Sequence, residues 1–220
     1  MTNLASLMFG FSMFAMFLVI TQLIQLPSQT GYGLGRSMLV AGLALAPSGL
    51  VMMVAAAISA RITQRYGPRT TLMLGALVVA IGYGLGTVMM GAVWQLATVA
   101  GVIGAGIGLA YGAMPALIMA AVPVSETEAA NSFNTLVRSI GTSVSSAVAG
   151  AILAGSAVVM GGTSIPSQDG FRLILAIASG TALVALVFAA FLPRPIDRPA
   201  VPSTLPTEVI AEPDVSPARG

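Results

Sequence analysis

Long stretches without a charged residue decide what this chain can fold into. They cover most of the first 193 residues, namely 1–35, 37–60, 70–125, 139–168 and 173–193. An ionised side chain at the centre of a lipid bilayer costs about 2.5 to 3.5 kcal/mol on insertion scales. Stretches that avoid this cost over such lengths predict helices that cross a membrane.

The composition points to the same class of protein. Apolar residues make up 56% of the sequence and charged residues only 7%, with a mean hydropathy of +0.95. A soluble domain carries about 25% charged residues. The basic residues are all arginine and stand singly between apolar runs, so the net charge of +2 does not indicate a nucleic-acid partner. The expected partners are the lipid bilayer and small hydrophobic compounds.

The predicted fold class is an all-α integral membrane protein with six transmembrane helices. A crossing needs about 20 apolar residues to match a hydrocarbon core about 30 Å thick, so the stretch 70–125 must cross twice. Residues 91–95, with Trp94 at headgroup level, mark the turn between these crossings. The predicted spans are residues 4–26, 38–60, 71–90, 95–122, 131–159 and 172–192.

Arginine near the span ends predicts the orientation. An even number of crossings puts both termini on one side of the membrane, and cytoplasmic loops carry the excess of arginine. We therefore expect both termini in the cytoplasm and the protein in the plasma (inner) membrane. Five arginines would lie on the side of the termini and two on the opposite side, namely Arg61, Arg65, Arg69, Arg194 and Arg198 against Arg36 and Arg172.

The last segment, residues 193–220, is rich in proline and is predicted to be a disordered cytoplasmic tail. Missing residue types narrow the chemistry further. The chain has no cysteine and no histidine, and no acid lies in any predicted span. Without these groups a general base or a metal cage is hard to assemble. We expect neither an enzyme nor a bound cofactor or metal.

The fourth span carries small residues at a helical spacing. Gly104, Gly108 and Gly112 recur every four residues and share one face, along which a neighbouring helix can approach closely. Pro115 is expected to end or kink this helix. Two interpretations remain open for the glycine face, either helix packing alone or a bendable helix that lines a cavity.

Arg138 is the one ionisable residue predicted to lie deep in a span. If the fifth helix begins near Asn131, Arg138 lies two turns in, about 10 Å along the axis. Its long side chain either reaches back to the interface or faces a polar cavity. A partner acid for it would have to come from another polypeptide.

The first span combines phenylalanine and methionine with two glutamines at its outer end, which suits a pocket for apolar and variable ligands as well as ordinary packing. From these spans we predict a substrate cavity. Its candidate residues are Phe14, Gln22, Gln25, Tyr111, Met114, Asn134 and Arg138.

Residues 60–69 resemble the cytoplasmic loop motif of the major facilitator superfamily, Gly-x-Leu-x-Asp-Arg-x-Gly-Arg-Arg. Arg65, Gly67 and Arg69 match, whereas Gln64 stands in place of the acid. Residues 40–49 and 130–141 resemble helices in the second half of the fourteen-span drug:proton antiporter branch, the multidrug exporters.

The resemblance implies the C-terminal six-helix half of such a transporter, built as a three-plus-three inverted repeat with a substrate site near the midplane. It also implies proton-coupled export of apolar or amphiphilic compounds by alternating access. The titrating acids of the family lie in the N-terminal half, so this chain would need that half or a second copy of itself. The alternative is a non-transporting helical subunit, or a fragment with no activity alone.

Overall fold

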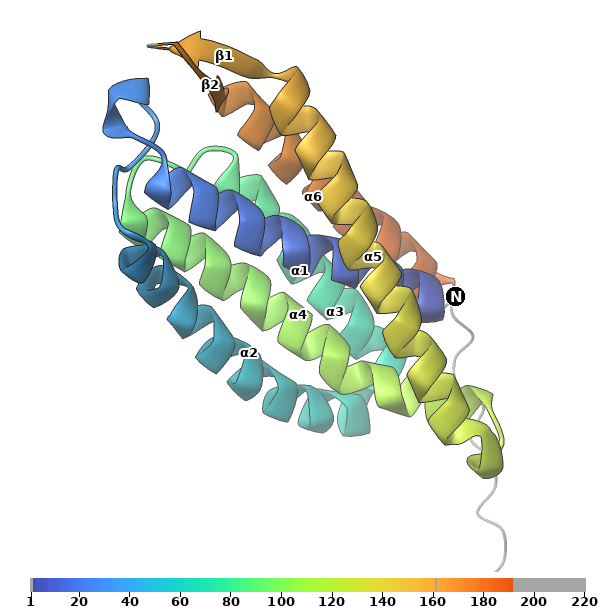
Figure 1. The fold of residues 1–220 in the computed structure, drawn as a ribbon. Coiled ribbons are helices and arrows are strands. Elements are labelled where there is room, and N and C mark those ends of the chain that lie inside the picture. Colours follow the sequence, from blue (N-terminus) through green and yellow to red (C-terminus); the bar gives the residue numbers. More distant parts are fainter. Residues whose placement is uncertain (1, 161, 192–220) are drawn as a thin grey trace, which may run out of the picture.

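Six long helices alternate in direction and form one bundle (Figure 1). The computed structural model describes residues 2–160 and 162–191, so the predicted tail at 193–220 lies outside the described residues. All six helices are long and apolar enough to cross a membrane. They are α1 (Thr2–Gln25), α2 (Met38–Tyr66), α3 (Pro68–Gly86), α4 (Val93–Ala121), α5 (Thr127–Gly155) and α6 (Gln168–Ala190). The prediction of an all-α membrane protein with six transmembrane helices is confirmed.

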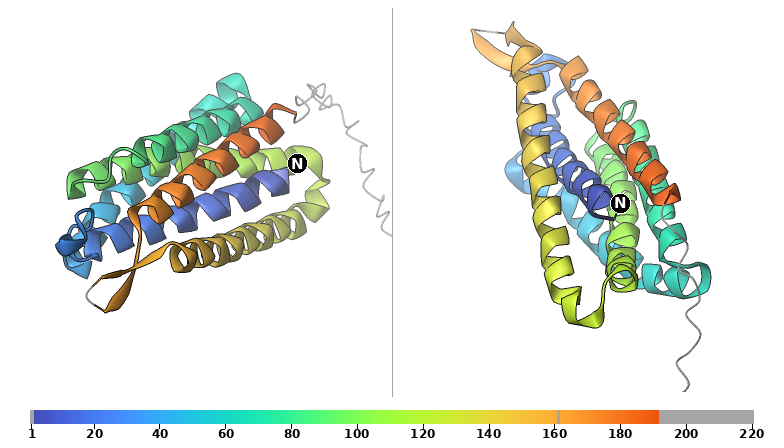
Figure 2. Two further views of the ribbon diagram at one scale, coloured as in Figure 1. Left: turned by 90° about the horizontal axis from the view of Figure 1, so that it is seen from above. Right: turned by 90° about the vertical axis from the view of Figure 1, so that its right-hand side faces the viewer.

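Short elements occupy three of the connections. The 3₁₀ turns η1 (Ser28–Thr30) and η2 (Val124–Glu126) precede α2 and α5, and a hairpin of β1 (Ala157–Met160) and β2 (Thr163–Pro166) joins α5 to α6. The hairpin projects beyond the neighbouring helix ends (Figure 2). Figure 1 shows the start of α1 and the end of α6 at the opposite end of the bundle, as an even number of crossings requires.

One sequence prediction about a helix end is wrong. The fifth span was expected to run to residue 159, but α5 ends at Gly155 and the next residues pair as an antiparallel hairpin. Val158 and Val159 favour strand pairing, and Gly162 enters β2 with a positive φ of 79° that a tight turn needs. Of the two alternatives predicted for Pro115, an end or a kink, the helix end is excluded, because α4 continues to Ala121.

The two helix triplets, α1–α3 and α4–α6, make equivalent contacts with each other. α4 packs against α2 and α3, and α1 packs in the same way against α5 and α6, while α3 and α6 contact each other. Contacts inside each triplet are sparse. This is the pattern of a three-plus-three inverted repeat, in which each triplet completes the other.

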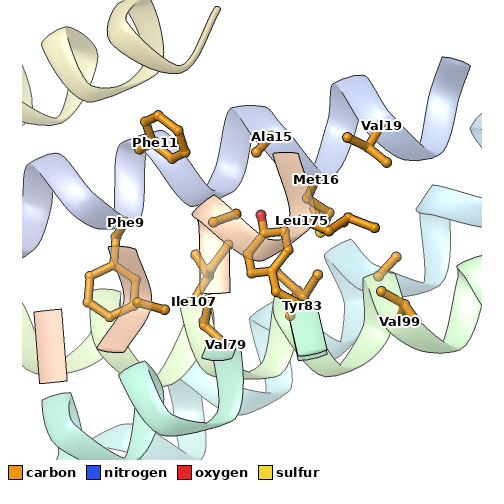
Figure 3. Close-up of a cluster of buried hydrophobic side chains, with 14 of the residues drawn as sticks. Phe9, Phe11, Ala15, Met16, Val19, Val79, Tyr83, Val99, Ile107 and Leu175 are labelled. Atoms are coloured by element: carbon orange, nitrogen blue, oxygen red, sulfur yellow. The ribbon is translucent and has the colours of Figure 1, made fainter. Parts of the chain in front are cut away.

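The core lies where α1, α3, α4 and α6 meet. Tyr83 of α3 is fully buried there, and its hydroxyl donates a hydrogen bond to the backbone carbonyl of Ser12 in α1. It is one of the buried side chains drawn in Figure 3, with Phe9, Ile107 and Leu175. In the most apolar 18-residue stretch of each helix, 56% of the residues are buried in α1 and 61% in α4, but only 22% in α2 and in α5. α1 and α4 are therefore the central helices, and α2 and α5 are peripheral.

Candidate functional site

Tyr111 of α4 is the meeting point of three helices. The guanidinium carbon of Arg138 in α5 lies 4.8 Å from the centroid of its ring. Phe9 of α1 contacts the same ring edge to face, with centroids 6.4 Å apart, and the Tyr111 hydroxyl lies 3.8 Å from the sulfur of Met13. The half-buried phenol is thus held between an aromatic edge, a thioether and a cation.

A second polar group lies one turn before Arg138 on α5. Asn134 is buried, and its side-chain amide donates to the Asn3 side-chain oxygen at 3.0 Å and to the Ser6 hydroxyl at 2.6 Å, both in α1. The Ser6 hydroxyl lies 3.3 Å from the Met114 sulfur of α4. Four of the predicted cavity residues, Tyr111, Met114, Asn134 and Arg138, are thereby brought into one polar cluster.

The start of α5 differs from the prediction. α5 begins at Thr127 and not near Asn131, so Arg138 is eleven residues from the helix start, about 16 Å along the axis. The predicted distance of about 10 Å from the helix start is corrected accordingly.

The glycine face of α4 lies against α2. A Cβ at Gly104 would come 2.7 Å from the Ser48 carbonyl oxygen, and one at Gly112 would come 2.6 Å from the Ser59 side chain. Gly108 lies as closely against the Met52 carbonyl. These helices approach so tightly that only glycine fits between them.

Pro115 follows on the same helix and has no amide hydrogen. The Tyr111 carbonyl four residues earlier therefore loses its usual helical donor. A free backbone acceptor is thus expected next to the polar cluster.

A pocket of about 410 Å³ opens between α1, α2 and α4, and its wall is almost entirely apolar. The only polar side chain in the lining is Ser48, whose hydroxyl donates to the Leu45 carbonyl at 2.6 Å. The lining side chains that reach furthest from the backbone are Met13, Met16, Phe17, Leu45, Met52 and Ile107. We call this cavity the methionine pocket.

Three predicted cavity residues lie apart from this cluster. Gln22 and Gln25 occupy the C-terminal end of α1, and Gln25 donates to the Thr21 carbonyl of its own helix at 3.2 Å. Gln22 is nine residues beyond Met13, about 14 Å along the axis. Phe14 is half-buried and lines neither the methionine pocket nor the Tyr111 ring.

The loop motif forms a one-residue connection between α2 and α3. Gly67 has a φ of 84°, which suits glycine, and Pro68 begins α3 directly after it. Arg69 donates to the Ala190 carbonyl at the end of α6, whereas Arg65 is exposed and lies beside the Tyr66 ring. Gly67 makes the turn, and Arg69 ties α3 to the C-terminus of α6.

At the opposite end of the bundle, Tyr32 connects the α1–α2 loop to the hairpin. Its hydroxyl donates to the Pro166 carbonyl, and burial raises the pKa of this phenol.

Sequence reasoning did not single out Asn3, Ser6 or the α2 side of the methionine pocket. Asn3 stands near the start of the chain, where it resembles an ordinary interfacial residue, and Ser6 is an isolated hydroxyl in an apolar run. The available signal was the spacing of Asn3 and Ser6, which puts both side chains on one helix face. Polar groups that are buried together need a polar partner, such as Asn134.

A sequence model of the Major Facilitator Superfamily matches residues 2–216. No curated protein matches the chain. Among solved structures, the chain is similar to the proton:xylose symporter XylE bound to 6-bromo-6-deoxy-D-glucose, with 20% identity and a TM-score of 0.70 over 88% of this chain and 44% of that one. It is also similar to XylE from E. coli in an inward open conformation, with 18% identity and a TM-score of 0.66 over 88% and 47%. The chain thus spans about half the length of these transporters.

Proposed function

Because the chain belongs to the major facilitator superfamily, we propose that it forms one six-helix half of a secondary active exporter of apolar or amphiphilic compounds. In this proposal it is a proton-coupled multidrug-type antiporter in the plasma (inner) membrane, with both termini in the cytoplasm. Transport proceeds by alternating access around a site between two halves. The observation that carries the proposal is the apolar lining of the methionine pocket.

The pocket wall favours an apolar cargo over a sugar. Ligand sites are specified by a few placed polar groups, and a sugar needs several hydrogen-bonding side chains. In the methionine pocket the single hydroxyl, Ser48, is already bonded to its own helix. Methionine adapts to irregular apolar shapes, which suits variable ligands. The xylose named for the XylE structures is therefore not the substrate class that we propose for this chain.

Proton coupling in this proposal depends on a second half. The acids of the described residues are Glu126, Glu128 and Asp169, which lie in a 3₁₀ turn and in the first turns of α5 and α6. A carboxylate that carries a proton across must be reachable from both sides of the membrane, and these positions are at helix ends. An N-terminal half of the family fold, or a second copy of the chain, would supply the titrating acid.

The rival proposal is a helical membrane subunit without transport activity. Export from the native host separates the two. The measured quantity is the accumulation of a fluorescent lipophilic dye in cells that lack the gene and in cells that carry it again. The exporter proposal predicts lower accumulation with the gene, and this difference should vanish when a protonophore collapses the proton gradient. Equal accumulation in both strains would favour the subunit.

Filling the pocket provides the matched test. Gly49 lines the methionine pocket and has nothing within 4 Å of an added Cβ, so Gly49→Leu adds volume at the pocket wall from an open backbone position. Gly84 of α3 has the same free space but lies outside the pocket, which makes Gly84→Leu the control. We expect Gly49→Leu to raise dye accumulation and Gly84→Leu to leave it unchanged. Identical export by both variants would remove the pocket from the proposal.

A further inference from the structure

We propose that Arg138 and Tyr111 recognise the anionic group of an amphiphilic substrate whose apolar body occupies the methionine pocket. This inference rests on the proposed function and specifies its substrate class as organic anions.

The first support is the isolation of the charge. Within residues 2–160 and 162–191, Arg138 is the only charged residue far from a helix end, since it lies eleven residues from the start and seventeen from the end of α5. The one ion pair among these residues joins Arg172 to Asp169 at the other end of the bundle. An arginine guanidinium stays protonated in proteins, so this position carries a permanent positive charge. Charges inside a membrane mark functional pathways by default.

The second support is the donor inventory. A guanidinium has five N–H donors, many more than one phenol can accept. The ring of Tyr111, 4.8 Å from the guanidinium carbon, provides a cation–π contact that orients the cation and leaves donors for a ligand. A carboxylate or sulfonate fits this arrangement because two of its oxygens can accept a forked pair of N–H groups.

The third support is the connection between the cation and the apolar cavity. Met13 contacts the Tyr111 hydroxyl and also lines the methionine pocket. On α4, Ile107 and Gly104 line the pocket four and seven residues before Tyr111, about 6 and 10 Å along the axis. An anionic group at Arg138 would therefore have its apolar body within one or two helical turns. This distance suits a compact ring system on a short linker.

The same charge disfavours cations. A ligand cation of equal shape would approach a fixed positive charge in a medium of low dielectric, where repulsion is stronger than in water. The site should thus discriminate by sign between two compounds with one apolar skeleton.

Pyrenebutyrate and pyrenebutylammonium provide such a pair, since both carry the same fluorophore on a four-carbon chain. Saturable binding to the full chain in phosphatidylcholine nanodiscs is measured by fluorescence anisotropy, with empty nanodiscs as the blank. We expect pyrenebutyrate to bind at least about tenfold more tightly than pyrenebutylammonium, and Arg138→Gln to weaken its binding by about 10- to 100-fold. Arg138→Lys should keep part of the preference because it retains the charge without the planar fork.

Arg61→Gln is the matched control, because it removes one exposed arginine outside the site. It should leave both affinities unchanged. Equal affinities of the wild-type chain for the two probes would overturn the inference while leaving the proposed function intact. An equal loss of preference in Arg61→Gln and Arg138→Gln would overturn it too. If neither probe bound saturably, the inference would also be overturned, whereas the proposed function would still be decided by dye export from the native host. The wild-type comparison decides the question even if Arg138→Gln does not fold.

Discussion

Gly141 of α5 lies directly against the backbone carbonyl of Leu7 in α1, with no space for a Cβ between them. The contact is reciprocal, since Gly10 of α1 lies in the same way against the carbonyl of Arg138. Two glycines at one crossing let the backbones approach as closely as membrane helices can. This crossing fixes the backbone of Arg138 against α1 and so sets the position of the charge beside Tyr111.

The close crossing of α1 and α5 predicts opposite changes in stability for two glycine substitutions in α5. Gly141→Ala should lower the stability by about 1 to 3 kcal/mol, because its Cβ meets backbone that cannot move aside. Gly150→Ala should raise it by about 0.5 to 1 kcal/mol, because that site is open and alanine is the better helix former. Thermal unfolding followed by circular dichroism measures both. An unchanged or raised stability of Gly141→Ala would contradict the close crossing.

The six crossings could be predicted from sequence because charge is excluded from the hydrocarbon core. Charge did not predict where the helices end. α2 continues through Arg61 and Arg65 to Tyr66, since a helix that leaves the membrane is no longer restricted to apolar residues. At the outer end of α5 the apolar run continues without interruption into Val158 and Val159. Hydropathy therefore could not reveal the change from helix to strand.

The candidate site was predictable only in part. Tyr111 and Arg138 were found because polar and ionisable residues are rare in the spans. Which residues meet depends on helix rotation and on the level at which helices cross, which the sequence does not specify. Gln22 and Gln25 were therefore grouped with Tyr111, although α1 meets Tyr111 at Met13, about 14 Å or more from both glutamines along the axis. The methionine pocket needed α2 as its third wall, and nothing in the α2 sequence marks that face.

The buried Asn134 predicts an energetic coupling between α5 and α1. Asn134→Leu leaves the hydroxyl of Ser6 and the amide of Asn3 without this partner, and should cost about 1 to 3 kcal/mol. Ser6→Ala in the Asn134→Leu background should cost less than in the wild type. A double-mutant cycle of unfolding free energies measures the difference. Additive costs would show that the hydrogen bond contributes nothing to stability.

Removal of the Arg69 side chain is expected to let the C-terminal end of α6 fray. Its guanidinium donates to the Ala190 carbonyl, where the C-terminal end of α6 attracts positive charge. Arg69→Gln should destabilise this end by about 1 kcal/mol and speed amide exchange in the last turn of α6. Arg65→Gln, four residues away at an exposed side chain, is the control and should leave exchange there unchanged. Faster exchange in both variants would point to a general effect of charge.

The contact between Tyr32 and the hairpin is expected to lose its stabilising effect at high pH. Burial raises the pKa of Tyr32 above its ordinary value of about 10. Because the folded-state pKa is the higher one, this phenol stabilises the fold fully below about pH 10, and the contribution is lost as the pH rises through the folded-state pKa. Tyrosine absorbance near 295 nm should show a late-titrating component in the wild type that Tyr32→Phe lacks. A loss of amplitude near pH 10, in place of the late component, would contradict the raised pKa of Tyr32.

A cysteine-free chain allows the same contact to be probed at one site. Ser164→Cys places a unique exposed thiol in β2. Adding Tyr32→Phe should increase the mobility of a spin label at this position, because the hydrogen bond to Pro166 is removed.

Most helix contacts are between the two triplets and few are within one triplet, so the order of synthesis affects how the helices assemble. α1 finds most of its neighbours in α5 and α6, and α4 finds its own in α2 and α3. When the ribosome has delivered α1, α2 and α3 but not yet α4, each is inserted in the bilayer, yet these three helices have few contacts with one another. Their assembly must wait for α4, and α1 cannot be enclosed until α5 and α6 have followed. A nascent chain of this design depends on the lipid, or on an insertion chaperone, to keep its early helices from aggregating.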